Sequence, residues 1–156
     1  MDKIIIRKAV LSDMETLLRF EQGVINAERP FDPTLKGDPN YYYDIGAMIA
    51  ASHIELLVVE TSNEIIGSGY ARIDRSEPYL RHEQHAYFGF MYVDPAHRGK
   101  GVNKMIVDAL EQWSLSQGIT EMRLEVYVGN AAAISAYEKV GFVKHMTEMR
   151  KGLIKE

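Results

Sequence analysis

The stretch of the sequence whose residues most clearly could do chemistry is VDPAHRGKGVN, residues 93–103, which joins an apolar run to an amphipathic one. Asp94 precedes a proline, and a residue in that position disfavours helix, so a strand should end there. The basic, glycine-punctuated residues 98–101 then lead into a helix, whose first N–H groups are unpaired and lie at the positive end of its dipole. This arrangement predicts a phosphate cradle. An ordinary charged turn between a strand and a helix is the alternative.

This stretch matches neither of two common phosphate-binding patterns. The P-loop requires Gly-Lys followed by Ser or Thr after a four-residue gap, and the dinucleotide fingerprint requires a second glycine spacing; the sequence has neither. A second stretch, NAAAISAYEKVGF (residues 130–142), begins at Asn130, a favoured N-cap, and ends at Gly141, a favoured C-terminal cap. Tyr137 follows Asn130 by seven residues, two turns along the same helix face. A tyrosine in that position is most often half-buried packing.

The composition is that of one globular domain of 156 residues with a net charge of −4. The acidic balance argues against a nucleic-acid partner. Without cysteine, disulfides, thiolate nucleophiles and thiolate metal sites are excluded, and no metal site is expected. The apolar run near the start is only three residues long, and no stretch approaches membrane-spanning length. We therefore expect a cytoplasmic protein with no membrane partner.

Residue patterns predict an α/β (α+β) domain over residues 1–156, with a mixed, mostly antiparallel sheet flanked by helices. The element order is β-α-α-β-β-β-α-β-α-β. Ser12 and Glu15 have the spacing of a capping box, which places the first helix start at Ser12. Strands are expected at Ile4–Val10, Glu55–Glu60, Ile65–Asp74, His85–Val93, Glu121–Val128 and 142–153, and the later helices at Ile45–Ile54, 103–118 and 131–140. Residues 29–44 read as an irregular segment with turns.

Taken together, the two stretches resemble the GNAT superfamily of acetyl-CoA-dependent N-acetyltransferases. The family's acyl-CoA motif, Gln/Arg-x-x-Gly-x-Gly/Ala, is read here as RGKGVN, residues 98–103, and its second motif as Asn130, Tyr137 and EKVGF. The N-terminal IRKAVLSDMETLL and the order of elements extend the likeness over nearly the whole chain. One departure is Asn103, where the family usually has Gly or Ala, and it puts the tightness of CoA binding in question.

The resemblance implies acetyl-CoA as the cofactor. Loop amides would hold its pyrophosphate, the end of the preceding strand would pair with the pantetheine arm like an added strand, and a backbone N–H there would polarise the thioester carbonyl. Asn130 would contact the arm. The implied cofactor-binding residues are Met91, Tyr92, Val93, Arg98, Gly99, Lys100, Gly101, Val102, Asn103, Asn130 and Tyr137.

The resemblance also implies direct attack by a primary amine in a ternary complex, with Tyr137 as the general acid for the departing thiolate. The attacking amine must lose a proton, but the strand 85–93, where the family often has a carboxylate, contains none. The candidates for the general base are His85, Glu83 and Tyr87, and a water chain to solvent stays open as an alternative.

The acceptor amine should lie against the irregular segment that follows the first helix. Its candidate binding residues are Arg29, Asp32, Tyr41, Tyr42 and Tyr43, and Glu28, Asp38 and Asp44 add negative charge that could meet a cationic amine. These residues do not choose among a small amine, an amino acid and a peptide or protein amine. A non-catalytic acyl-CoA-binding or regulatory module on the same fold is the alternative function. A homodimer is implied by the resemblance alone.

Overall fold

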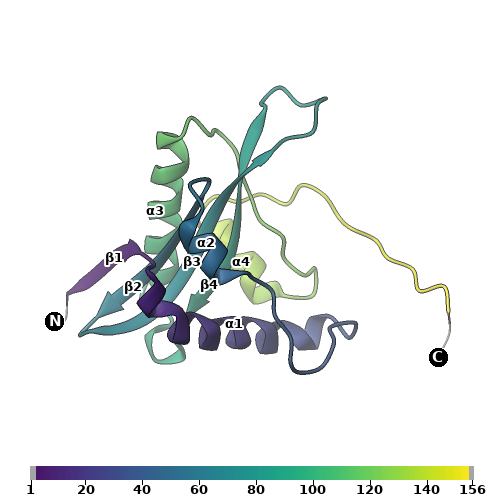
Figure 1. The fold of residues 1–156 in the computed structure, drawn as a ribbon. Coiled ribbons are helices and arrows are strands. Elements are labelled where there is room, and N and C mark those ends of the chain that lie inside the picture. Colours follow the sequence, from purple (N-terminus) through teal and green to yellow (C-terminus); the bar gives the residue numbers. More distant parts are fainter. Residues whose placement is uncertain (1–2, 155–156) are drawn as a thin grey trace.

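The computed structural model describes residues 3–154, and these form one five-stranded sheet with helices on both faces (Figure 1). The strands lie in chain order across the sheet, β1-β2-β3-β4-β5. Their bounds are β1 Ile4–Lys8, β2 Ile54–Thr61, β3 Glu64–Arg75, β4 Gln84–Val93 and β5 Met122–Arg123. Neighbours from β1 to β4 are antiparallel, and β5 is parallel to β4. The predicted mixed, mostly antiparallel sheet is confirmed.

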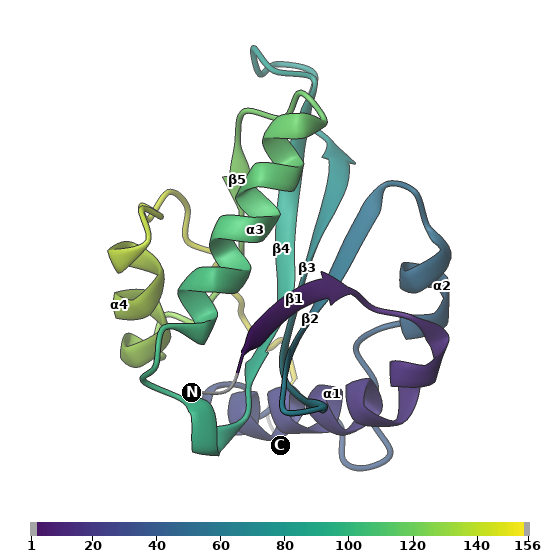
Figure 2. The same ribbon diagram turned by 90° about the vertical axis from the view of Figure 1, so that its left-hand side faces the viewer.

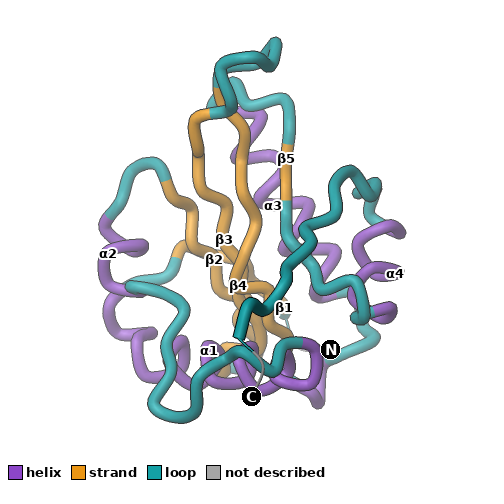
Figure 3. Tube along the Cα trace, turned by 90° about the vertical axis from the view of Figure 1, so that its right-hand side faces the viewer, coloured by secondary structure: helices purple, strands orange, loops and turns teal. Residues whose placement is uncertain are grey.

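Four α-helices cover this sheet and create two separate apolar cores. They are α1 Met14–Glu28, α2 Ile45–Ala50, α3 Val102–Ser116 and α4 Ala131–Lys139, with short 3-10 turns at Leu11–Asp13, Arg29–Phe31 and Pro95–His97. Side chains of α1 and α2 pack with Val58, Tyr70 and Phe90 on one face, and those of α3 pack with Ile66 and Phe88 on the other. Figure 2 shows α3 lying along the sheet with α4 on the β5 side, and Figure 3 shows α2 at the opposite side. Alternating strand residues therefore bury both faces of the sheet.

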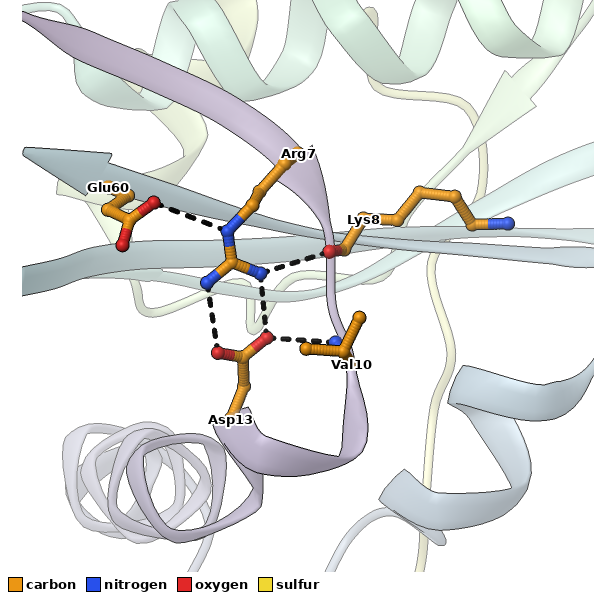
Figure 4. A network of polar contacts seen from close by, with 5 residues as sticks. All are labelled: Arg7, Lys8, Val10, Asp13 and Glu60. Carbon is orange, nitrogen blue, oxygen red and sulfur yellow. Dashed lines mark hydrogen bonds and ion pairs between the residues drawn. The ribbon is translucent and has the colours of Figure 1, made fainter. Parts of the chain in front are cut away.

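The connection from β1 to α1 is fixed by a buried carboxylate. Asp13, whose side chain is only 5% exposed, accepts two hydrogen bonds from the Arg7 guanidinium at 2.9 and 3.0 Å (Figure 4). It also accepts the backbone N–H of Val10 at 2.8 Å, and Arg7 reaches Glu60 on β2 at 3.3 Å. The predicted capping box at Ser12 and Glu15 is therefore wrong. A 3-10 turn begins at Leu11, the α-helix follows at Met14, and Asp13 supplies the side-chain acceptor.

The end of the chain departs from the predicted order of elements. Residues 142–153 form no strand, and residues 143–154 run as an irregular, exposed tail, yellow in Figure 1. The strand predicted at Glu121–Val128 is reduced to Met122 and Arg123. The shared reason is that a strand forms only against a neighbour, and in the described part of the chain nothing pairs with the outer edge of β5.

Within residues 3–154, no helix is both long enough and apolar enough to cross a bilayer.

Candidate functional site

The open edge of β4 is the central feature of the candidate site. β5 pairs with β4 only at Met122 opposite Ala86 and at Arg123 opposite Tyr87. Beyond Tyr87, β4 continues to Val93 while residues 124–128 leave the sheet. The outer backbone edge of residues 88–93 is thus free to pair with an extended ligand, as an exposed sheet edge pairs with a peptide. Three of the predicted cofactor-binding residues, Met91, Tyr92 and Val93, lie on this segment and are partly buried.

A β-bulge interrupts β4 on this same segment. Tyr70 on β3 faces Gly89 and Ser68 faces Tyr92, so two residues of β4 lie opposite Gly69 alone. Phe90, inside the bulge, has a left-handed φ of +53°, and the Ser68 hydroxyl donates to its carbonyl at 3.0 Å. A bulge leaves the amide of its extra residue outside the ladder. The bulge therefore places irregular backbone beside the open edge, and the Tyr43 phenol lies next to the backbone of Phe90.

The turn from β4 to α3 has a left-handed backbone at two of its glycines. Gly99 and Gly101 adopt φ of +76° and +81°, a region that is unfavourable for residues with a Cβ. Gly101 is also the N-cap of α3, which has no side-chain cap, so the first amides of the helix have no protein side-chain acceptor at that cap. All residues from Arg98 to Gly101 are exposed, whereas Val102 is buried in the core and Asn103 is partly buried.

The two cations of this turn have different surroundings. Arg98 folds back, and its Nε donates to the Val93 carbonyl at 2.9 Å while its guanidinium lies 5.9 Å from the Tyr92 ring centre. Lys100 is exposed at the tip of the turn. Arg98 therefore braces the end of β4, and Lys100 is the charge that projects into solvent.

Three aromatic rings place Tyr137 beside the open edge. Phe88 on β4 packs edge-on against Phe142 at 5.8 Å between ring centres, and Phe142 packs against Tyr137 on α4 at 5.9 Å. Burial, with a smaller contribution from the charge of Glu28, raises the pKa of Tyr137 to about 12. At neutral pH the phenol is therefore protonated and can donate its proton in a hydrogen bond or transfer it.

Asn130 acts first as a helix cap. Its side-chain oxygen accepts the Ala133 N–H at 3.2 Å, and its own N–H donates to the Tyr127 carbonyl at 2.9 Å. The sequence prediction of an N-cap is confirmed. The side-chain NH₂ takes no part in this cap.

Tyr87 holds a carboxylate that the sequence analysis did not identify. Its hydroxyl donates to Glu125 at 3.2 Å, at the point where residues 124–128 separate from β4. Burial, followed by the nearby charge of Glu125, raises the pKa of Tyr87 well above its usual value, so this phenol is not a base at neutral pH. Arg72 lies 5.0 Å from the Tyr87 ring centre, but its charge is paired with Asp74 at 2.7 Å. Glu125 has no ion pair among residues 3–154.

The other two candidates for the general base lie elsewhere. His85 is 6% exposed, and its Nδ1 is 2.8 Å from the Ser76 hydroxyl, both side chains being buried at the start of β4. Burial lowers the pKa of His85. Glu83 is exposed in the loop before β4, where its carbonyl accepts the Ser76 N–H. Both precede the two residue pairs that join β4 to β5, and neither lies on the open segment 88–93.

The three consecutive tyrosines, residues 41–43, are held against α1 by a buried carboxylate. Glu21, which is fully buried, accepts the backbone N–H groups of Tyr42 and Tyr43 at 2.9 and 2.8 Å. Tyr43 stacks on the bulge residue Phe90 at 4.5 Å between ring centres, so it lies beside the open edge. The Tyr42 hydroxyl is buried without a hydrogen-bond partner, and burial raises its pKa to about 12. Tyr41 is 64% exposed.

The remaining predicted acceptor residues, Arg29 and Asp32, form internal contacts. Arg29 donates to the Lys36 carbonyl at 3.0 Å and pairs with Asp38 at 3.1 Å, which braces the loop after α1. Asp32 is 8% exposed and accepts from Thr34, from the Tyr127 hydroxyl at 3.1 Å and from Arg150 at 3.2 Å. These hydrogen bonds, those from Thr34 first, lower its pKa to about 2.

Glu28, at the end of α1, is a partly buried carboxylate on this side. Burial raises its pKa, and an interaction with Tyr42 opposes that rise. Its charge raises the pKa of Tyr137 and of Tyr43, so it lies near both phenols. The sequence placed Glu28 only among several loop charges. Nothing in the sequence pointed to Glu125, because its contact with Tyr87 depends on where β5 separates from β4.

In the described part of the chain, no group of three or more His, Cys, Asp or Glu side chains is arranged to hold a metal ion.

The comparisons with a family model and with curated sequences both match acetyltransferases. The model of the family described as "Acetyltransferase (GNAT) family" matches residues 22–142. Among curated proteins, mycothiol acetyltransferase of Amycolatopsis mediterranei is 29% identical over 96 residues, which are 61% of this chain and 32% of that protein. The matched segments span 19% to 64% of the lengths of the first three curated relatives.

Solved structures show the same fold. A variant of the BH1408 protein of Bacillus halodurans aligns with a TM-score of 0.87 and 20% identity, covering 96% of this chain and 99% of its own. A protein of Clostridium acetobutylicum described as an acetyltransferase and solved with acetyl-CoA aligns with a TM-score of 0.76 and 20% identity, covering 97% of both chains.

Proposed function

This chain belongs to the GNAT acetyltransferase family, and from that premise we propose that it is an acetyl-CoA-dependent N-acetyltransferase acting on a primary amine. The acetyl group moves by direct attack of the amine on the thioester while both substrates are bound. The observation that carries the proposal is the open edge of β4, which has a bulge in its middle and a left-handed glycine turn at its end.

The turn before α3 is suited to the pyrophosphate of the cofactor. Its glycines have the φ values that the turn needs, and a Cβ placed on Gly99 or Gly101 would meet no protein atom within 4 Å, so the space beside them is open. The unpaired first amides of α3 donate to the phosphate oxygens, and the helix dipole adds positive potential. Lys100 supplies the side-chain charge. Asn103 follows Val102 in the first turn, where its amide adds a donor.

The open edge of β4 is suited to the pantetheine arm and the thioester. Residues Met91 to Val93 pair with the arm's amides as a strand would, and the side-chain NH₂ of Asn130 donates to it from the facing helix. The bulge around Phe90 would hold the thioester carbonyl, and a backbone N–H there would polarise it. This donor is pre-positioned because Ser68 holds the bulge through the Phe90 carbonyl at 3.0 Å.

Tyr137 acts on the leaving thiolate from the side of α4. Its phenol is held by the packing of Phe142 against Phe88, and a pKa of about 12 keeps it protonated at every physiological pH. It stabilises the thiolate mainly as a hydrogen-bond donor, because the thiolate is the weaker base of the two.

Glu125 accepts the proton of the amine. A primary amine of the lysine type has a pKa near ~10.4 and reaches the site as an ammonium ion. Glu125 lies where β5 separates from β4, and Tyr87 fixes one of its oxygens. Glu28 adds a second negative charge on the α1 side, and the rings of Tyr43 and Tyr70 lie between. Two carboxylates without ion pairs favour a cationic acceptor over one that presents a carboxylate.

The test is thiol release from acetyl-CoA with a panel of amines, amino acids and peptides. Turnover should depend on the amine, and Glu125→Gln should lower kcat/KM by about 10²-fold or more, the usual contribution of a general base. Tyr87→Phe should give a smaller loss, because the carboxylate remains but is less fixed. Glu64→Gln, at the exposed start of β3, is the matched control.

Three results would count against parts of this scheme. If CoA binds and no amine supports turnover, the chain is a non-catalytic acyl-CoA-binding module. If amines are acetylated and Glu125→Gln is as active as the Glu64→Gln control, the proton leaves by another route, such as water. A preference for acceptors bearing a carboxylate next to the amine would contradict the charge argument.

A further inference from the structure

Residues 124–128 have a strand-like sequence but leave the sheet after only two residues of β5. Those two residues pair with β4, and the pairing ends at Tyr87. In the register of these pairs Leu124 would come next, opposite Phe88. The bulge of β4 begins only after Gly89, so it does not explain why the pairing ends before it. The segment is therefore held away from β4 by contacts of its own.

The side chains of this segment still alternate as they would in a strand. Leu124 packs with the core beneath α3. Glu125 accepts the hydroxyl of Tyr87, a residue that packs with the core on the α1 side. Tyr127 donates to Asp32, in the loop after α1. This is the period of two that a strand requires, so the segment could continue the β4–β5 pairing without turning its side chains over.

Asp32 is the anchor of Tyr127. Its Oδ2 accepts the Tyr127 hydroxyl at 3.1 Å. Its Oδ1 accepts the backbone and the hydroxyl of Thr34 at 2.9 and 2.5 Å, and Arg150 at 3.2 Å. The two donors of Thr34 fix the carboxylate so that its other oxygen is directed at the phenol. These hydrogen bonds, those from Thr34 first, lower the pKa of Asp32 to about 2, so the acceptor is charged at neutral pH and the bond is of the stronger, charge-assisted kind.

The loop after α1 also holds the ring of Tyr127. Phe31 stacks on that ring with 6.2 Å between ring centres. A Cβ placed on Gly129 would lie 3.5 Å from the Phe31 ring, so the turn that follows Tyr127 is close to the same residue. The loop is itself braced by hydrogen bonds from Arg29 to two of its later residues. It is therefore a fixed point to which the segment is tied by both the ring and the hydroxyl of one tyrosine.

We propose that the hydrogen bond from Tyr127 to Asp32 is a latch that keeps residues 124–128 away from β4 and so keeps the edge of residues 88–93 open for the cofactor. Without the latch, the segment continues the β4–β5 pairing in its present register and occupies the edge that the pantetheine arm needs. Asp32 and Tyr127 are thus positioning residues, which act through the segment. This inference rests on the proposed use of that edge by the arm, and a measurement on the protein without cofactor tests the latch by itself.

The first test is amide hydrogen exchange, followed by mass spectrometry on the protein without cofactor. Tyr127→Phe keeps the ring that stacks on Phe31 and removes only the hydroxyl. Peptides covering residues 88–93 and 124–128 should exchange about 10-fold more slowly in this variant, because the loss of a hydrogen bond to a charged group favours the closed arrangement and newly paired amides are protected. Equal exchange, or the faster exchange of a segment that has only been loosened, would overturn the proposal.

Two further variants separate the latch from general effects of substitution. Arg150→Gln removes the donor to the other oxygen of Asp32 and should leave the exchange of both segments as in the wild type. Asp32→Asn leaves an uncharged, weaker acceptor and should slow exchange in the same two segments as Tyr127→Phe. The proposal is wrong if Arg150→Gln slows exchange as much as Tyr127→Phe, or if Asp32→Asn does not slow it.

The second test is CoA binding measured by calorimetry, with Tyr79→Phe in the exposed β3–β4 loop as the matched control. A protein whose open state is only partly populated binds its ligand with an affinity reduced by that fraction. Tyr127→Phe should therefore raise the Kd for CoA and the KM for acetyl-CoA by about 10-fold, while kcat at saturating acetyl-CoA changes little. A lower kcat with an unchanged Kd would show that Tyr127 acts on the reaction itself, and the latch would be wrong.

The two tests also distinguish failure of the latch from failure of the proposed function. Slower exchange of residues 124–128 in Tyr127→Phe with unchanged CoA affinity would show that the arm does not use this edge, which overturns the cofactor role of the latch. If the wild type binds CoA and no amine supports turnover, the proposed function fails, while the exchange and affinity results still support the latch.

Discussion

Replacing Tyr137 with phenylalanine tests what kind of help the leaving thiolate receives. The phenol has a pKa of about 12, while a thiol of the cysteine type has one near ~8.5. At about 1.36 kcal/mol per unit, complete transfer of the proton from Tyr137 to the thiolate is uphill by about 5 kcal/mol. A hydrogen bond donated to a charged group contributes about 1.5–3 kcal/mol instead. We therefore expect Tyr137→Phe to lower kcat by about 10- to 150-fold, and no more.

The assay is thiol release at saturating acetyl-CoA with a good amine acceptor. The ring of residue 137 and its packing on Phe142 remain, so KM for acetyl-CoA and the unfolding temperature should change little. Tyr79→Phe, in an exposed loop, is the control. An unchanged kcat would show that the hydroxyl does not reach the leaving group. A loss of 10⁴-fold or more would show that full proton transfer is required and would refute the acidity argument.

Two further predictions concern stability and cofactor binding. Asp13→Ala should lower the free energy of unfolding by about 2 kcal/mol, less than the 3–5 typical of a broken buried pair because Arg7 is a third exposed. Arg7 lowers the pKa of Asp13, so this stabilisation is complete above the pKa of Asp13 in the unfolded chain, near ~3.9, and is lost as the pH falls through its pKa in the folded protein. Urea unfolding at pH 7 and pH 3 should show that the difference in unfolding free energy between wild type and variant is smaller at pH 3. An equal difference at the two pH values would contradict the assignment. Gly101→Ala should cost about 1 kcal/mol through its φ of +81° and weaken CoA binding measured by calorimetry, whereas Gly37→Ala, at an open position where no positive φ is needed, should do neither.

Several elements of the fold follow from the sequence because their causes are local. The strand 85–93, the glycine turn, the helix capped at Asn130 and the antiparallel pairs β2–β3 and β3–β4 each depend on residues close together in the chain. The first helix shows the limit. Ser12 and Glu15 have the right spacing for a cap, but Asp13 takes that position because Arg7 from β1 reaches it, a contact that depends on the folded path of the chain.

The acidic and phenolic groups of the candidate site depend even more on contacts between residues that are remote in the chain, which local sequence does not predict. Tyr87 was a candidate base by its place in β4, but burial raises its pKa and turns it into a donor to Glu125. Glu125 and Glu28 are separated by almost a hundred residues, and both face the site because β5 leaves the sheet and α1 ends nearby. Asp32 and Arg29, chosen for their charge, are already paired within the protein.

The sequence by itself determined the family, the sheet with its flanking helices, and the glycine turn at Arg98 to Gly101, because each depends on the spacing of particular residue types and on local backbone preference. Tertiary structure decided which side chains are charged, paired or free to act, since burial and distance between remote residues set those properties. It also decided the fate of residues 142–153. Their sequence favours a strand, but a strand needs a neighbouring edge to satisfy its backbone, and no strand within residues 3–154 pairs with that segment.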